Sequence, residues 1–568
     1  MSKQWMHIAV ASVSIASLQS YVLAQTSASV LVPETFEPDS QRSAPAVTVA
    51  RDPGVEPPPG SESLFIRVGR VEIVGAFDEM AEANQALRDQ LEGNRVPVST
   101  LFRATGALEA AYAQAGFVLA RVVLPRQQVV DGGTLRVIVV DGFVETIDAE
   151  RIPEPVRDRV NVLTEDLVDE KGLKQGELER PLLLAGDTYG LALESTLTEG
   201  ETPGGTVLVL DGEYQLWTWS LGLDNLADDD LGGFSLNGGF ELNSALGLGE
   251  IFYGRFAGAP DDFFAEDPKY RVLALGSVFP LGRDGLTFNI EGTSSRTKPD
   301  DPDAPTISEF DRLSFRLYYP WIRTRSVNLA SQLIFDRQSD EQSLLFGGQE
   351  VPIYDDELSV VRATLVASRA FESGAVLEAD MVASQGIDVL GVRREGEGGT
   401  PLSRQGADAT FSKLTVGLRY SRPLEGGLNF SFDSRAQSSF GDPLLSSEQF
   451  NPVGPAELSS FDSGGLSGDN GWVARFEVSR PEAVNFGAFP VIANPYAFAA
   501  FGEVGLEQPT VFEESNVQAS SLGVGLELFT DEQSAFRSGS LRLEYGRGER
   551  DDDIADDNRF NIIATRRF

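Results

Sequence analysis

Apolar and polar residues alternate one by one through most of the chain after residue 214. The clearest runs are 234–242, 312–319 and 521–528, in which nearly every second residue is apolar. A period of two places successive side chains on opposite faces of a β-strand. The pattern therefore predicts a strand-rich region from 214 to 568, with one apolar and one polar face on each strand.

The connections between these runs alternate between short and long. Three short ones are 282–285, 372–374 and 425–427, and the long, polar, acidic ones are 224–233, 259–268, 297–309, 387–408 and 441–470. Short turns at one end and long loops at the other are typical of an outer-membrane barrel, which closes because lipid satisfies no backbone hydrogen bonds. A soluble β-sandwich also alternates, but a region of this length would usually divide into domains. We predict a barrel of about sixteen strands with an apolar outer face. Its hydrated lumen is expected to carry Glu241, Arg312, Arg316, Glu527, Arg542 and Glu544.

Residues 64–213 carry one pattern twice, in 64–141 and in 142–213. Each copy predicts a strand, two amphipathic helices and two further strands, with Gly132-Gly133 and Gly204-Gly205 at the last turns. The fold class is thus mainly β, with two small α/β modules of β-α-α-β-β order ahead of the barrel. Such a module exposes a sheet edge to which an extended chain can add a strand. In the first module that edge is predicted at Val118, Arg121 and Leu124; two spacer modules without a binding role are the alternative.

The first 63 residues predict no folded domain. A positive start and a moderately apolar stretch in residues 1–24 indicate an export signal, with a short buried helix as the alternative. Residues 25–63 contain many prolines, which break helices and favour extended backbone. We expect a linker with little fixed structure there.

Composition excludes several kinds of chemistry. The chain has 46 basic and 86 acidic residues and a net charge of −40, which argues against nucleic-acid binding. It has no cysteine, and its one histidine, His7, lies in the predicted signal. Thiolate or histidine metal sites and a Ser-His-Asp triad are therefore excluded from the remaining chain. No phosphate-binding loop occurs and no acidic cluster has the spacing of a calcium loop, so we predict no enzyme activity, cofactor or metal.

Short sequence motifs, in order, resemble a known family. They are Ala120-Arg121-Val122 and Leu124-Pro125-Arg126-Gln127 in the first module, Leu182-Leu183-Leu184 in the second, and Glu448-Gln449-Phe450 and Leu466 to Trp472 in the barrel. The chain resembles the two-partner secretion outer-membrane transporters, also called haemolysin secretion/activation proteins, which carry two periplasmic POTRA modules before the barrel. The resemblance implies export of a partner exoprotein to the surface of a Gram-negative cell without nucleotide. The implied partners are that unfolded cargo, the barrel-assembly machinery and outer-membrane lipid. An outer-membrane assembly factor of the same superfamily and a passive porin are the alternatives.

The resemblance also implies functional positions. In the family the sixth extracellular loop enters the lumen with a Val-Arg-Gly-aromatic apex, for which this chain has Leu458, Ser459, Ser460 and Phe461, so the arginine position is Ser459. The flank of that loop is Asp469, Gly471 and Trp472. The lumen partner of the apex is expected at Glu503, with Gly505 after it, and Arg475 is the substitute cation for Glu503. Restoring arginine at position 459 is expected to create a bond to Glu503 and stiffen the loop. The last residue, Phe568, resembles the aromatic signal for barrel insertion.

Overall fold

The computed structural model describes residues 27–38, 47–49 and 57–568, apart from 129, 302–304, 348, 463, 487–488, 512, 531–533 and 553–556. The chain forms two compact units. One is Gln215–Phe568 together with the described residues that precede Asp39, and the other lies between Ser40 and Tyr214. The predicted export signal, 1–24, lies outside the described residues.

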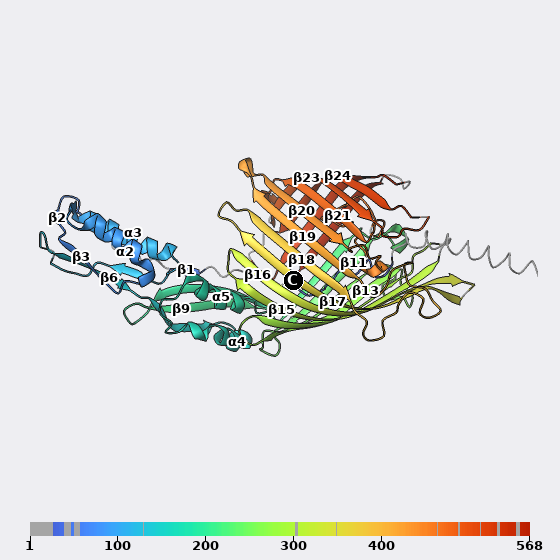
Figure 1. Ribbon diagram of the computed structural model, residues 1–568, viewed down its shortest axis with the longest axis horizontal. Helices are drawn as coiled ribbons and strands as arrows, with labels where there is room; N and C mark the ends of the chain where they lie inside the picture. The colour runs from blue at the N-terminus through green and yellow to red at the C-terminus, as the bar shows by residue number, and fades with distance from the viewer. Residues whose placement is uncertain are drawn as a thin grey trace, which may run out of the picture. The chain divides into compact units, whose positions relative to one another are not determined.

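The larger unit is a closed antiparallel barrel (Figure 1). Its strands are β10 (Trp217–Asp224), β11 (Ser235–Asn243), β12 (Ile251–Gly258), β13 (Tyr270–Leu281), β14 (Leu286–Thr297), β15 (Thr306–Arg323), β16 (Val327–Phe346), β17 (Gln349–Ala370), β18 (Val376–Gly386), β19 (Ser412–Pro423), β20 (Asn429–Ser438), β21 (Asn470–Ser479), β22 (Glu482–Phe486), β23 (Phe489–Gly505), β24 (Asn516–Thr530), β25 (Ser538–Arg550) and β26 (Asp557–Arg567). β21 and β22 both pair with β23, as one interrupted strand, and β26 pairs with β10 to close the ring. The predicted sixteen-stranded barrel is confirmed.

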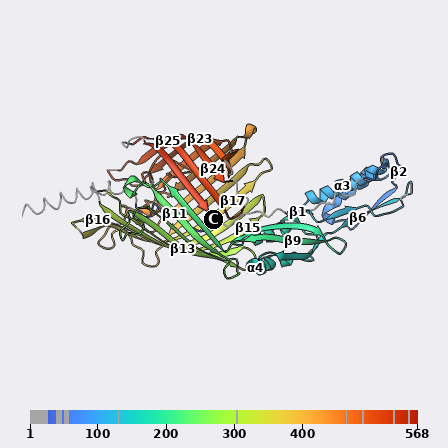
Figure 2. The ribbon, with the colours of Figure 1, turned by 180° about the vertical axis from the view of Figure 1, so that it is seen from behind.

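The two faces of the barrel strands differ as the alternation predicts. On β15, Leu313 and Leu317 are exposed on the outside, whereas Arg312 and Arg316, each one residue earlier, are buried in the lumen. Figure 2 shows the strands of the opposite wall running at a similar oblique tilt. Gly282 and Gly285 have φ values of +72° and +86°, a conformation that favours glycine and lets a four-residue turn join β13 to β14. No helix in the described part of the chain is long and apolar enough to cross a membrane.

The smaller unit contains two modules with the predicted β-α-α-β-β order. The first comprises β3 (Arg70–Val74), α2 (Ala81–Leu91), α3 (Val98–Gln114), β5 (Arg121–Val123) and β6 (Thr134–Val140), with a small added sheet of β2 (Phe65–Arg67) and β4 (Arg95–Pro97). The second comprises β7 (Phe143–Arg151), α4 (Glu154–Thr164), α5 (Gln175–Gly186), β8 (Leu191–Glu199) and β9 (Gly205–Tyr214). The helices of each module bury their apolar faces on its sheet, with Leu87 and Leu108 in the first core and Val160 and Leu182 in the second.

The expectation of a linker with little fixed structure is wrong at two places. Residues 27–38 belong to the barrel unit, and β1 (Val47–Val49) pairs in parallel with β8, which extends the second sheet to the order β1-β8-β9-β7. Proline prevents helix, but it does not prevent an extended segment from adding to a sheet edge or being held by side chains of a barrel wall. Composition therefore predicted the local conformation and missed the tertiary contacts.

Candidate functional site

Two segments of the chain fold into the barrel lumen. The first is 27–38, which we call the N-terminal segment. The second is the connection between β20 and β21, residues 439–469, which we call loop 6. Both are held by side chains on the polar inner face of the wall, so the lumen is the candidate functional site.

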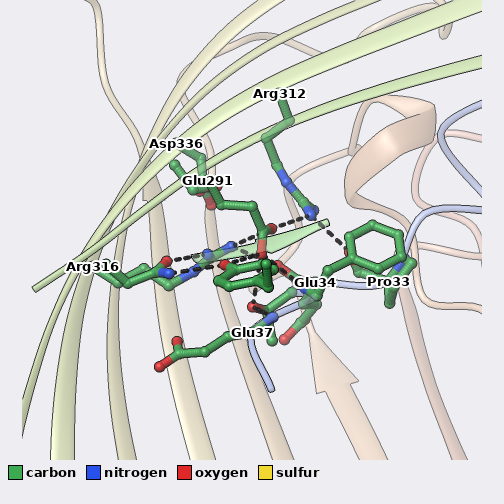
Figure 3. Close-up of polar contacts among 12 residues, drawn as sticks. Pro33, Glu34, Glu37, Glu291, Arg312, Arg316 and Asp336 are labelled. Atoms are coloured by element: carbon green, nitrogen blue, oxygen red, sulfur yellow. Dashed lines mark hydrogen bonds and ion pairs between the residues drawn. The ribbon is translucent and has the colours of Figure 1, made fainter. Parts of the chain in front are cut away.

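The charged side chains of the wall hold the middle of the N-terminal segment through its backbone (Figure 3). Arg312 Nη2 donates to the carbonyl of Pro33 at 2.8 Å, and Arg316 Nη2 donates to the carbonyl of Glu34 at 3.0 Å. The backbone N–H of Phe36 donates to Glu291 Oε2 at 3.0 Å. Glu291 also pairs with both arginines, at 3.4 and 3.2 Å, so one buried carboxylate orients the donors and accepts from the segment itself.

The rest of the segment makes turns and a small apolar contact. Val30 N–H and Val32 N–H donate to the carbonyls three residues earlier, which forms turns without an α-helix. Ala28 N–H donates to Ser308 Oγ at 3.0 Å, and Ser27 Oγ lies 3.2 Å from Tyr354 Oη. Partly buried Leu31, Val32 and Phe36 pack against Ala227, Leu231, Ala259, Tyr270 and Val272 of the wall and its loops.

The apex of loop 6 is bound to the wall by its serine hydroxyl. Ser459 Oγ donates to Glu544 and accepts from Arg475 Nη1 at 2.9 Å, while Arg475 Nη2 pairs with Glu544 Oε2 at 2.6 Å. The Ser459 carbonyl accepts from Asn561 Nδ2 at 2.7 Å. The guanidinium of Arg475 also lies 3.7 Å from the ring centroid of Phe498, which adds a cation–π contact. The cation that the resemblance expects on the loop is thus supplied by the barrel wall.

Two glycines of β25 let the apex lie close against the wall. A Cβ added at Gly546 would lie 2.3 Å from Ser460 Oγ, and one added at Gly548 would lie 2.6 Å from the ring of Phe461. Further along the same inner row, Arg550 Nη1 donates to the carbonyl of Gly465 at 2.8 Å. The row from Glu544 to Arg550 is therefore a continuous docking surface for loop 6.

The base of loop 6 is fixed by buried ion pairs. Glu448 pairs with Arg362 at 2.6 Å and with Lys413 at 2.8 Å. Burial alone would raise the pKa of Glu448, but these two cations hold that pKa at about 2, so the carboxylate stays charged. Asp469 pairs with Arg404 and accepts from the backbone N–H groups of Leu444 at 2.9 Å and Glu507 at 2.6 Å.

Sequence reasoning placed Arg475 beside the apex but named the wrong carboxylate. On β23, Glu503 shares its face with the exposed Phe501 and lies opposite the exposed Trp472 of β21, so it points out of the lumen. The carboxylate that meets Arg475 is Glu544. Glu544 was expected to face the lumen, and only the three-dimensional closure of the barrel brings it to the loop.

The other flank positions have structural roles at the loop base. A Cβ added at Gly471 would lie 2.6 Å from the ring of Phe450, so this glycine lets loop 6 pack on β21. The Gly505 carbonyl accepts from Asp469 N–H at 2.9 Å. The N–H of Phe568 donates to the Trp219 carbonyl at 2.8 Å, which extends the closing pair of strands.

The predicted strand edge of the first module is shorter than expected. Only Arg121 lies within β5; Val118 precedes it and Leu124 follows it. Glu109 pairs with Arg121 at 3.2 Å and accepts from Val122 N–H at 2.9 Å. One backbone donor of this edge is therefore already satisfied, which leaves less of β5 for an added strand.

A cavity of about 310 Å³ remains inside the barrel unit. It is lined by residues of the N-terminal segment, of loop 6 and of the inner wall, among them Ser29, Arg362, Glu448 and Glu513. The lumen thus contains solvent-accessible space next to the two inserted segments.

A chain that combines a closed barrel holding two inserted segments with a unit of two α/β modules has counterparts among known proteins. The model of the POTRA domain, ShlB-type, matches residues 66–142, and the model of the haemolysin secretion/activation protein ShlB/FhaC/HecB matches residues 204–528. The chain belongs to the haemolysin secretion/activation protein family. It is therefore a two-partner secretion transporter of the outer membrane that exports a partner exoprotein, with its POTRA modules in the periplasm.

Individual proteins are similar to the chain in sequence or in fold. The outer membrane transporter CdiB of Escherichia coli O6:K15:H31 (strain 536 / UPEC) is 23% identical over 450 residues, which cover 77% of this chain and 72% of the relative. The hemolysin transporter protein ShlB of Serratia marcescens is 24% identical over 401 residues, covering 68% and 67%. The solved structure of CdiB from Escherichia coli has a TM-score of 0.68 at 18% identity, covering 97% of this chain and 95% of that one. A structure of BamA from Haemophilus ducreyi lacking POTRA domains 1–3 has a TM-score of 0.50 at 13% identity, covering 89% and 100%.

Proposed function

We propose that the N-terminal segment is a removable plug, that loop 6 stays docked, and that the cargo passes through the space the segment leaves. The observation that supports this is the contrast in how the two are held. The segment is bound through backbone groups by two arginines and one glutamate, whereas loop 6 carries buried ion pairs of its own. A segment held by its backbone is replaceable by another extended chain, because every polypeptide offers the same carbonyl and N–H groups.

The modules capture the cargo before it enters the barrel. β1 already adds to the β8 edge over Ser195, Thr196 and Leu197, so this edge accepts an extended strand in parallel orientation. We assign cargo binding to β8 in addition to the β5 edge. Deletion of residues 64–141 is expected to abolish export while the barrel still inserts; export at the normal level would favour two spacer modules.

The remaining partners follow from the outer surface. The exposed apolar residues of the barrel contact outer-membrane lipid, and the barrel-assembly machinery inserts the chain by recognising β26 with Phe568 at its end. Replacing Phe568 by Ser is expected to lower the amount of inserted barrel, measured by heat-modifiable gel mobility of the membrane fraction. An unchanged amount contradicts this role of Phe568.

The plug is tested by tethering each inserted segment. The chain has no cysteine, so introduced pairs cross-link without background. Ser27 Oγ and Ser308 Oγ are 3.5 Å apart, close enough for a disulfide in the variant S27C/S308C after small adjustment. Oxidation is expected to block export, and reduction is expected to restore it.

The matched control tethers loop 6. The backbone N–H of Ser460 donates to Ser521 Oγ at 3.4 Å, so position 521 of β24 lies beside the apex. The pair S460C/S521C is used as the tether once a gel shift without reductant shows that its disulfide has formed. Oxidised S460C/S521C is expected to export normally, and each single-cysteine variant serves as a further control. Normal export by oxidised S27C/S308C contradicts the plug, and loss of export by both oxidised pairs shows that loop 6 also moves.

A further inference from the structure

Two aspartates face each other inside the barrel without a counter-charge. Asp340 of β16 and Asp356 of β17 are direct cross-strand partners, and both are fully buried. Directly opposite side chains in an antiparallel pair have Cβ atoms about 5 Å apart. Each carboxylate has one oxygen, Oδ2, with no hydrogen-bond partner.

Six other buried carboxylates of the lumen form ion pairs with arginine or lysine. These are Glu241, Glu291, Asp336, Glu448, Asp469 and Glu544. Among the residues that the structure describes, no lysine or arginine forms an ion pair with Asp340 or Asp356. Two carboxylates this close in a buried place cannot both stay ionised without a positive charge between them.

The surroundings of the pair consist of oxygen donors. Tyr354 Oη donates to Asp340 Oδ1 at 3.2 Å and lies 3.2 Å from Ser27 Oγ, which in turn lies 2.9 Å from Ser29 Oγ. Ser403 N–H occupies Asp356 Oδ1 at 2.8 Å, which leaves Oδ2 available. Carboxylate and hydroxyl oxygens without nitrogen or sulfur suit hard divalent cations, above all Ca²⁺.

Ions can reach this level of the barrel. On β16 the residues that alternate with Asp340 and point the other way are Arg337, Ser339 and Glu341, all polar. A lipid-facing row would be apolar, so this stretch lies beyond the hydrocarbon core, on the side of the long loops. The cavity of about 310 Å³ also reaches Ser27, Ser29 and Tyr354.

We propose that Asp340 and Asp356 form a divalent-cation site of the Ca²⁺ type, completed by the hydroxyls of Ser27 and Ser29. Because these serines belong to the N-terminal segment, the bound cation joins the segment to the wall at β16 and β17. The site goes beyond export itself, because it assigns a bound cation to the contact between the segment and the wall, and calorimetry tests that binding without a measurement of export.

The same strands provide a matched control. Glu341 and Asp355 are also direct cross-strand partners, next to the aspartate pair but on the opposite face, and with Glu357 they form a cluster of three carboxylates. That cluster already has cations, because Arg393 pairs with Asp355 at 2.8 Å and Arg337 pairs with Glu357. The control cluster therefore has more carboxylates than the aspartate pair, but two of its carboxylates have arginine partners and those of the pair have none among the described residues.

The test is calorimetric titration of Ca²⁺ into the full-length protein in detergent. Wild type is expected to bind one Ca²⁺, D340N/D356N to bind it at least tenfold more weakly, and E341Q/D355N to bind it as wild type does. S27A/S29A is expected to weaken binding several-fold, which distinguishes a site shared with the segment from one made by the wall alone. Heat-modifiable gel mobility checks that each variant is a folded barrel; if the double variant fails to fold, D340N and D356N singly give the same ranking.

Three results overturn the proposal. They are a wild-type protein that binds no Ca²⁺, D340N/D356N with unchanged affinity, and a loss of binding in E341Q/D355N with retention in D340N/D356N. Chelation of Ca²⁺ from wild type in a planar bilayer is expected to raise the frequency of open states, and the same treatment of D340N/D356N is expected to change nothing. Equal responses of the two proteins to chelation also contradict the site.

Discussion

The N-terminal segment and loop 6 lie in the same lumen but differ in the charged contacts that hold them. Arg312 and Arg316 of the wall donate to backbone carbonyls of the segment, whose own side chains add hydrogen bonds from uncharged groups such as the hydroxyls of Ser27 and Thr35. Loop 6 also offers backbone carbonyls to the wall, but its own Glu448 and Asp469 add buried ion pairs. Recognition of backbone groups tolerates many sequences and allows another extended chain to replace the segment. Ion pairs with particular side chains require the sequence of loop 6 itself.

Loop 6 and the N-terminal segment also differ in how fully their apolar side chains are buried. Leu458 and Leu466 of loop 6 are almost fully buried, whereas Leu31 and Val32 of the segment are only partly buried. Full burial of such a side chain contributes about 1.5–3 kcal/mol. Removal of the segment therefore costs less free energy than removal of the loop.

The largest expected effect comes from deletion of the segment. Removing residues 27–38 should raise single-channel conductance severalfold, because the segment fills the lumen beside β14–β17, and the barrel should keep its heat-modifiable mobility. Removing 452–466 of loop 6 should instead lower the denaturant midpoint of the barrel, because the apolar cluster on β21, β23 and β24 loses its cover. Equal loss of stability in both deletions would remove the contrast between the two segments.

A smaller effect is expected from one buried charge of loop 6. Glu448→Gln leaves Lys413 and Arg362 facing a neutral amide, which should destabilise the barrel by about 3–5 kcal/mol. The folded pKa of Glu448 is low, so its contribution is complete above the ordinary value of 4.5 and is lost as the pH falls towards about 2. Urea titrations should therefore show the gap between wild type and E448Q close over that range.

An exposed ion pair is the control for E448Q. Arg480 and Glu482 are 3.1 Å apart, and both are more than half exposed. Glu482→Gln should change the free energy of unfolding by less than about 1 kcal/mol. A comparable effect of E448Q and E482Q would mean that burial does not strengthen the contacts of loop 6.

The sequence predicts which side chains face the lumen, but it does not predict which of them meet or where backbone groups are bound. Alternation predicted that Arg316 and Glu544 face the lumen, because the period of a strand fixes its faces. Alternation could not predict the hydrogen bond between Ser459 and Glu544, because these residues are 85 positions apart and meet only when loop 6 enters the barrel. It missed the N-terminal segment because Pro33 and Glu34 contribute carbonyl groups, which no residue type reveals.

A substitution at the loop apex is expected to have a smaller effect than E448Q. Ser459→Arg was expected from the sequence to bond Glu503, but Glu503 points outward and Arg475 already lies beside the apex. The new guanidinium should meet Arg475 and cost about 1.5–3 kcal/mol through lost hydrogen bonds to charged groups. The swap S459R/R475S moves the cation onto the loop and should recover most of the loss in denaturant titrations and in channel flicker. A swap no better than S459R alone contradicts the assignment of Glu544 as the shared carboxylate.

The smallest effect is expected from the side chains of the segment. The Glu34 carbonyl accepts from Arg316, and the exposed carboxylate of Glu34 acts on Arg362 and Arg435 only at longer range. Thr35 Oγ1 makes only a long bond of 3.4 Å to Glu291. E34A/T35A should therefore leave the single-channel conductance unchanged and the free energy of unfolding within about 0.5 kcal/mol of wild type. Arg316→Ala, which removes the donor, should raise the open frequency. A larger effect of E34A/T35A than of R316A would mean that the segment is recognised by sequence.

The added strand β1 has a consequence for which cargo the second module accepts. β1 is part of the same chain, so it competes for β8 at an effective concentration that reaches millimolar for a short flexible tether. A free peptide that pairs only as briefly as β1 is outcompeted at ordinary concentrations. β1 covers three residues of a strand nine residues long, so a longer peptide gains contacts that β1 lacks. With cargo binding at β8 as proposed, we expect this edge to select for length, and the affinity of model peptides should rise steeply once they pair with more than those three residues.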